Sequence, residues 1–190
     1  MRNISIATIV FAAIALAVAQ PARADSWSVD PVHSSLVFKI SHLGSSFTWG
    51  FLHSPEGKVN WDSADPTKGS IEVTAKLANL STFNAKRDQH LRSPDFFDAK
   101  QFPTLTFKSS SIKAAGDDKF DVTGDLTIRG TTKPVTVTLK KLGTATMQGT
   151  TKTGFDGTFT INRLDYGLAF MPQGIGADVE IHVALEVDKK

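Results

Sequence analysis

The chain has 190 residues, a length that suits one domain with its own core, and it carries 21 Lys and Arg against 19 Asp and Glu. This near balance gives no electrostatic field strong enough to favour a nucleic-acid partner. No cysteine is present, which excludes disulfides, thiolate nucleophiles and thiolate metal ligands.

The N-terminus has the features of a cleavable signal peptide. Arg2 precedes an uncharged apolar run over residues 4–19, which is shorter than the roughly 20 residues of a membrane-spanning helix. The A-x-A motif at residues 22–24 places small residues where the signal peptidase needs them, so we expect cleavage directly after it. Removal of residues 1–24 takes away two arginines and no acid, which leaves a formally neutral protein. We therefore expect residues 25–190 to form an exported protein with no stable membrane anchor and no nucleic-acid partner.

Alternation with a period of two dominates the rest of the chain, which is typical of strands with one buried face. It is clearest over residues 179–187, where Val, Ile and Leu occupy every second position. Similar runs are centred near Trp27, Val37, Val59, Val73, Phe107, Val122, Val137, Phe159 and Val183. Turn-forming residues separate several of them, at 65–69, 115–118 and 129–134. About eight or nine strands in one domain predict an all-β fold, a single antiparallel β-barrel that closes or nearly closes.

One segment, residues 80–102, breaks this alternation. Some of its side chains fall on one helical face, at spacings of i, i+4 and i+7 or i+8: Phe83, Arg87 and either His90 or Leu91. Ser93 followed by Pro94 is typical of an N-cap with Pro at the first helical position. We therefore expect two short helices that cap an end of the barrel.

A barrel of about eight strands has room inside for one small ligand, and each buried methylene contributes about 0.8 kcal/mol to binding. The 13 Phe residues, against one Tyr, suit a dry interior. The apolar stretch 167–176, with Phe170 and Met171, is either an entrance flap or a loop folded onto the core. Certain inward-facing side chains are expected to line the cavity, although they can instead fill a solid core: Phe38, Phe107, Ile128, Phe159 and Val183.

Polar side chains are expected at the mouth of this cavity. Arg87 and His90 on the predicted helix, together with Arg163, can bind a phosphate or a quinone oxygen. The alternative is structural, because Arg87 or Asp88 can instead tie the helix to the rim of the barrel.

Two catalytic alternatives follow from the histidines. His33, His42 and His53 lie 9 and 11 residues apart, which matches no compact metal-ligand pattern, and no acid lies beside them at metal spacing. Asp30, His33 and Ser34 are close in sequence, but they form the entry to a strand and the chain lacks a G-x-S-x-G elbow. We therefore expect no metal ion, no cofactor and no catalytic residue.

Several longer motifs occur together along the chain. They are H-S-S at 33–35, with Phe38 and His42; Gly50-Phe51; R-D-Q-H-L-R-S-P-D-F-F-D at 87–98; F-P-T-L-T-F-K-S at 102–109; G-D-L-T-I-R-G at 124–130; and I-N-R-L-D-Y-G at 161–167. In these motifs the chain resembles the YceI-like family of periplasmic polyisoprenoid-binding proteins, over essentially all of residues 25–190. The chain departs from the family pattern over residues 49–57, which concerns His53 in particular.

The resemblance implies a lipocalin-like barrel that encloses an isoprenoid tail, as in isoprenoid quinones or polyprenyl phosphates. It adds His42 and Phe51 to the candidate ligand-binding residues. The leading hypothesis is therefore a non-enzymatic periplasmic carrier or sequestering protein for a long-chain isoprenoid lipid. Two alternatives stay open: a metal-dependent or other small-molecule enzyme built on the barrel, and a stress-related protein that binds a partner. The oligomeric state is undecided, and a homodimer is compatible with the sequence.

Overall fold

The structure is a computed structural model that describes residues 25–62 and 65–189. The predicted signal peptide, residues 1–24, lies outside the described residues. The strands are β1 (Asp25–Val29), β2 (Ser35–His42), β3 (Ser46–His53), β4 (Glu56–Trp61), β5 (Ser70–Lys76), β6 (Leu80–Ser81), β7 (Thr104–Ala114), β8 (Lys119–Ile128), β9 (Thr131–Met147), β10 (Thr150–Asn162) and β11 (Ile175–Lys189). The helices are α1 (Ala85–Leu91) and the 3-10 helices η1 (Pro66–Lys68), η2 (Leu77–Asn79) and η3 (Arg163–Tyr166).

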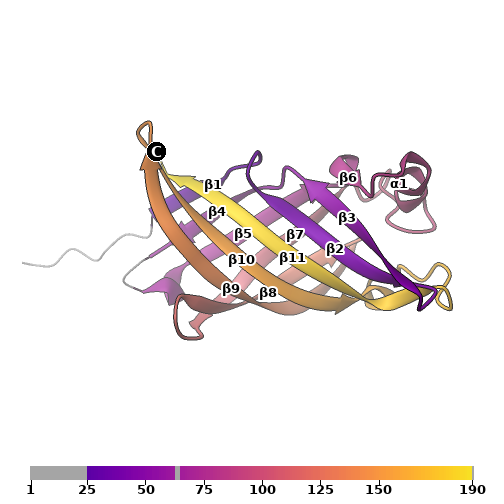
Figure 1. Cartoon of the computed structure of the whole chain (residues 1–190). Helices are drawn as coiled ribbons and strands as arrows, with labels where there is room; N and C mark the ends of the chain where they lie inside the picture. The colour runs from indigo at the N-terminus through magenta and orange to yellow at the C-terminus, as the bar shows by residue number, and fades with distance from the viewer. Residues whose placement is uncertain (1–24, 63–64, 190) are drawn as a thin grey trace, which may run out of the picture.

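The strand segments close into one antiparallel barrel of eight strands (Figure 1). β1 and β2 act as two halves of one bent strand, and so do β3 and β4, because β1 pairs with β4 while β2 pairs with β3. From β4 the order runs through β5, β7, β8, β9 and β10 to β11. β11 closes the barrel, since it pairs with β2 along most of its length and with β1 near its end. The predicted all-β, antiparallel barrel is therefore confirmed.

β3 is a strand that alternation did not predict. Its aromatic residues Phe47 and Trp49 are exposed, while Gly50 is buried, so its pattern is the reverse of an ordinary barrel strand. Gly50 pairs with Phe38 of β2, and a Cβ added at Gly50 would lie 2.1 Å from Phe38 Cζ. The glycine is needed here because the Phe38 ring lies across its backbone.

The segment between β6 and β7 holds one α-helix rather than the predicted two. α1 begins after Asn84, whose side chain accepts a hydrogen bond from Arg87 N at 3.0 Å. Phe83 lies outside the helix, with a positive φ of 59° and 78% exposure, so its predicted place on the helical face is wrong. No helix in the described part of the chain has the length and the apolar composition to cross a membrane.

The prediction of a second helix at Ser93-Pro94 is wrong. Backbone N–H groups after Pro94 bond back to the end of α1 instead. Phe97 N donates to the carbonyl of Leu91 at 3.0 Å, and Ala99 N donates to that of Arg92 at 2.9 Å. The residues that follow Ser93 therefore form turns folded back against the end of α1.

The interior of the barrel has two buried clusters. At the β1 end, Trp61 packs edge-on against Phe120, with ring centroids 4.8 Å apart, and lies 5.1 Å from Phe155. Toward α1, a second cluster is surrounded by side chains that are only partly buried. Its buried members are Ala75, Leu77, Leu80, Phe96, Leu105, Leu126, Ile128, Ile161, Tyr166 and Leu168. The two ends of the barrel therefore differ in how completely side chains fill them.

A network of charged side chains lies beside the corner between β1 and β2. Lys152 Nζ lies 3.1 Å from Asp30, 2.9 Å from Glu186 and 2.7 Å from Asp188. Burial alone would raise the pKa of Asp30, but hydrogen bonds from His33, the Val32 N–H and Lys152 outweigh it and hold that pKa well below its usual range. The hydrogen bond to Asp30 raises the pKa of His33. The network therefore joins the N-terminal strand to β10 and β11.

We predict that Gly50→Ala destabilises the protein by about 1–3 kcal/mol, because the added methyl displaces the Phe38 ring toward the interior. Gly143→Ala is the matched control, since nothing lies within 4 Å of a Cβ added at that β9 position. Urea denaturation of both variants measures the difference. Equal stability of the two variants would contradict the assigned contact.

We predict that Asp30→Asn lowers the melting temperature most between about pH 4 and 6.5. The depressed pKa of Asp30 contributes stability that is present above its unfolded pKa and lost as pH falls through the folded value. The raised pKa of His33 contributes stability that is present below its unfolded pKa and lost as pH rises through the folded value. Melting curves of wild type and variant from pH 3 to 9 test this, and a gap that does not vary with pH would contradict it.

Candidate functional site

The barrel encloses an apolar cavity of about 460 Å³, which lies in the range of small-molecule binding sites. Its lining is drawn from strands on all sides of the barrel, and also from α1 and the loop that precedes β11. The exposed lining residues include Arg87, His90, Phe170 and Met171, which places the mouth at the α1 end. No Asp or Glu is among the described residues that line it.

The structure places all but one of the predicted site residues on the wall of this cavity. Those that line it are Phe38, His42, Arg87, His90, Phe107, Ile128, Phe159, Arg163, Phe170 and Val183. Phe51 is not part of the lining: its ring stacks on His53 at 5.5 Å and meets Phe83 edge-on at 5.4 Å. The next residue, Leu52, lines the cavity instead, since successive residues of a strand point to opposite faces.

The middle of the cavity wall is only partly covered by other side chains. Phe107, Phe159 and Val183 lie within long strands and line the cavity, yet each is half-buried rather than buried. An inward-facing residue in the middle of a barrel strand that keeps accessible surface has space in front of it. The interior is therefore lined and not filled at this level.

Sequence reasoning missed many lining residues that share a face with the predicted ones. Leu36 and Ile40 lie two positions from Phe38, and Ile181 lies two positions from Val183. Alternation contains the signal that finds them. Others come from the segments that cap the barrel, and only the folded chain brings these to the cavity: Leu91, Phe96, Phe97 and Leu168.

Arg87 and Asp88 hold α1 in place through Thr82. The Arg87 guanidinium donates to Thr82 Oγ1 at 2.7 Å and to the Thr82 carbonyl at 2.8 Å. The buried Asp88 carboxylate accepts from Thr82 N at 2.8 Å and from its hydroxyl. These bonds match the structural alternative, in which Arg87 or Asp88 ties the helix to the rim of the barrel. Arg87 also lines the cavity.

Arg163 is buried and fastens the loop in front of the cavity. Its guanidinium donates to the carbonyls of Gly176 and Ile175, each at 2.8 Å, and to that of Leu168. Burial lowers the pKa of Arg163, and the described residues offer it no carboxylate partner. Its geometry fixes the course of the chain from η3 into β11, while its side chain also borders the cavity.

An aromatic group narrows the mouth. The rings of His90, Phe96 and Phe170 have centroids 5.0–5.1 Å from one another. His90 Nε2 is also bonded to Asp95 Oδ2 at 2.8 Å, which fixes the imidazole. Segments far apart in the chain therefore meet at the entrance, with apolar faces toward the cavity.

Among the described residues, one group of side chains outside the cavity has donor atoms close enough to hold a metal ion: Asp30, His33 and Glu186, whose donor atoms all lie within 4.8 Å of one another. The Lys152 ammonium already binds both of these carboxylates.

Ser34 donates its hydroxyl to the Glu186 carbonyl at 3.2 Å and accepts from Glu186 N at 2.9 Å. Its hydroxyl is thus engaged with β11 rather than with the neighbouring histidine.

Comparison with known sequences connects the chain to one family. The family model for the YceI-like domain matches residues 27–187. A UPF0312 protein of Pseudomonas putida is 41% identical over 165 residues, which cover 83% of this chain and 86% of that protein. A UPF0312 protein of Vibrio parahaemolyticus is 35% identical over 174 residues, which cover 90% and 92%.

Solved structures share the architecture. BcnA of Burkholderia cenocepacia superimposes with a TM-score of 0.74 at 28% identity, over 83% of this chain and 98% of that one. The YceI protein of Campylobacter jejuni gives 0.71 at 29% identity, over 79% and 90%. A polyisoprenoid-binding domain of Saccharophagus degradans gives 0.68 at 16% identity, over 86% and 98%, a likeness that concerns the fold alone. The family match along residues 27–187 and the curated relatives together show that this chain belongs to the YceI-like family.

Proposed function

We propose that this protein is a periplasmic, non-enzymatic carrier that encloses the tail of a long-chain isoprenoid lipid. The observation that carries the proposal is the apolar cavity of about 460 Å³ inside the barrel. The Saccharophagus domain of the same fold is described as binding polyisoprenoid, which agrees with such a ligand. A periplasmic location is supported by the signal-peptide features of residues 1–24.

The distribution of polar groups favours a ligand that enters with its tail first. The deep wall is built from branched aliphatic residues such as Ile71, Val122 and Leu139. His42, Arg87 and His90 are exposed lining residues and so lie at the mouth. An isoprenoid tail matches the deep wall, since each buried methylene contributes about 0.8 kcal/mol, and a polar head stays near donors at the entrance.

We predict that the protein purified from its own periplasm, without detergent, carries an isoprenoid lipid. Native mass spectrometry should show an added mass that organic extraction removes, and fragmentation of the extract should give isoprene-unit losses. A stoichiometric metal ion and no lipid would contradict the proposal and favour the enzymatic alternative.

We predict that Val183→Trp, which fills the cavity, lowers isoprenoid affinity at least about tenfold while the protein stays folded. The half-buried Val183 side chain has space in front of it, so the larger ring can be accommodated. Ala184→Trp is the matched control, because this neighbouring β11 residue is exposed on the outer face. Titration with a fluorescent isoprenoid compares the two variants, and equal affinities would place the ligand elsewhere.

A further inference from the structure

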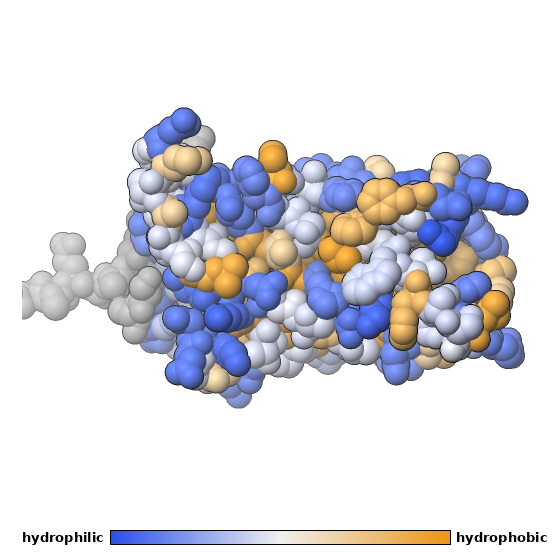
Figure 2. Space-filling model, in the orientation of Figure 1, coloured by the Kyte–Doolittle hydropathy of each residue, from blue (hydrophilic) through white to orange (hydrophobic). Residues whose placement is uncertain are grey.

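Three exposed apolar side chains stand together beside the mouth of the cavity. Leu43 is 61% exposed in the turn between β2 and β3, and Phe170 and Met171 are 38% and 43% exposed in the loop before β11. The two segments are joined, because Leu43 N donates to the Gly174 carbonyl at 2.7 Å. Both the Leu43 and Met171 side chains border Gly174. We call Leu43, Phe170 and Met171 the rim patch; Figure 2 shows apolar side chains at this end of the barrel.

At two of these positions, the backbone conformation disfavours the residue type that the chain has there. Leu43 has a φ of 54° and Met171 a φ of 49°, in the left-handed region that favours Gly or Asn. A large apolar side chain there adds exposed apolar surface to backbone strain. Other turns of the described residues share this backbone region, including that of the exposed Phe83, so what distinguishes Leu43 and Met171 is that both are apolar and lie side by side at Gly174.

The rim patch is continuous with the wall of the cavity. Phe170 and Met171 are both exposed and part of the cavity lining. The Phe170 ring also packs against His90 and Phe96 at the entrance. An apolar molecule that leaves the cavity therefore passes along apolar side chains until it reaches the outer surface.

We propose that the rim patch inserts into the surface of a lipid bilayer and so places the mouth of the cavity where its ligand enters or leaves. This inference rests on the proposed function, because a long isoprenoid lipid resides in a bilayer. Side chains on turns suit a fluid lipid surface, into which each can insert separately. The three side chains of the rim patch are uncharged, so insertion is expected to depend on apolar contact and not on anionic lipid.

Leu43→Asn tests the inference. Asn tolerates the left-handed backbone and removes the apolar side chain, and Leu43 does not line the cavity. Association with phosphatidylcholine vesicles, measured by flotation, should fall about tenfold, since a buried Leu side chain is worth that much or more. Uptake of an isoprenoid preloaded in those vesicles should slow in parallel, while binding of farnesol added from solution should stay unchanged.

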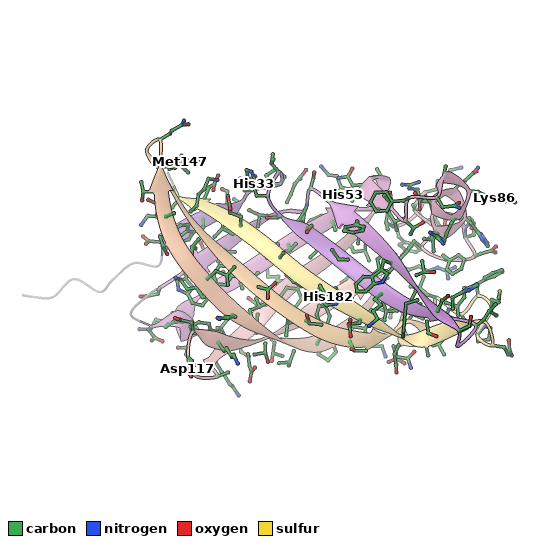
Figure 3. The ribbon with its side chains drawn as sticks, viewed as in Figure 1. His33, His53, Lys86, Asp117, Met147 and His182 are labelled. Carbon is green, nitrogen blue, oxygen red and sulfur yellow. The ribbon has the colours of Figure 1, made fainter. Side chains whose placement is uncertain are left out.

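Met147→Asn is the matched control, because it removes a residue that is 63% exposed at the opposite end of the barrel from α1 (Figure 3). It should associate with vesicles as the wild type does. Failure of the wild type to associate with vesicles, or equal association of Leu43→Asn, would overturn the membrane inference. A wild-type dimer that Leu43→Asn abolishes would overturn it in favour of an interface between copies. Binding of neither farnesol nor vesicle-borne isoprenoid by the wild type would instead refute the proposed function.

Discussion

The pairing of β11 with both β1 and β2 is the constraint on which the rest of the structure depends. It closes the barrel without a disulfide, and its register fixes which residues of every strand face inward. Ser34 bonds to the backbone of Glu186 at the junction, beside the charged network of Lys152. One strand therefore contributes Val187 to the solid end of the barrel and Val183 to the wall of the cavity.

Alternation predicted inward-facing positions well because it depends only on neighbouring residues. Phe38, Phe107 and Val183 were assigned to the interior from period two alone, and each lines the cavity. Whether such residues fill a core or line a space depends on the width of the closed barrel, which no local pattern contains. The motif that contains Phe51 carries no such alternation, and the Phe51 ring lies outside the cavity, stacked on His53.

Elements that depend on distant partners were the ones that sequence reasoning missed. The Ser93-Pro94 pair looks like a helix start, but Phe97 N and Ala99 N, which follow it, bond back to the end of α1. The charged network pairs Lys152 with Asp30, 122 residues away in the chain. The three carbonyl partners of Arg163 likewise become available only when the loop before β11 folds around it.

The fastened Arg163 has a consequence for how fast the entrance can change. Because the guanidinium binds carbonyls at both ends of the loop, opening by loop displacement would leave a buried charge without its acceptors. Rotation of the Phe170 side chain requires no such loss. Exposed side chains change rotamer in picoseconds to nanoseconds, whereas collective loop motions take far longer. Passage through the mouth is therefore expected to be limited by the ligand's own exit from its apolar surroundings and not by a slow gate.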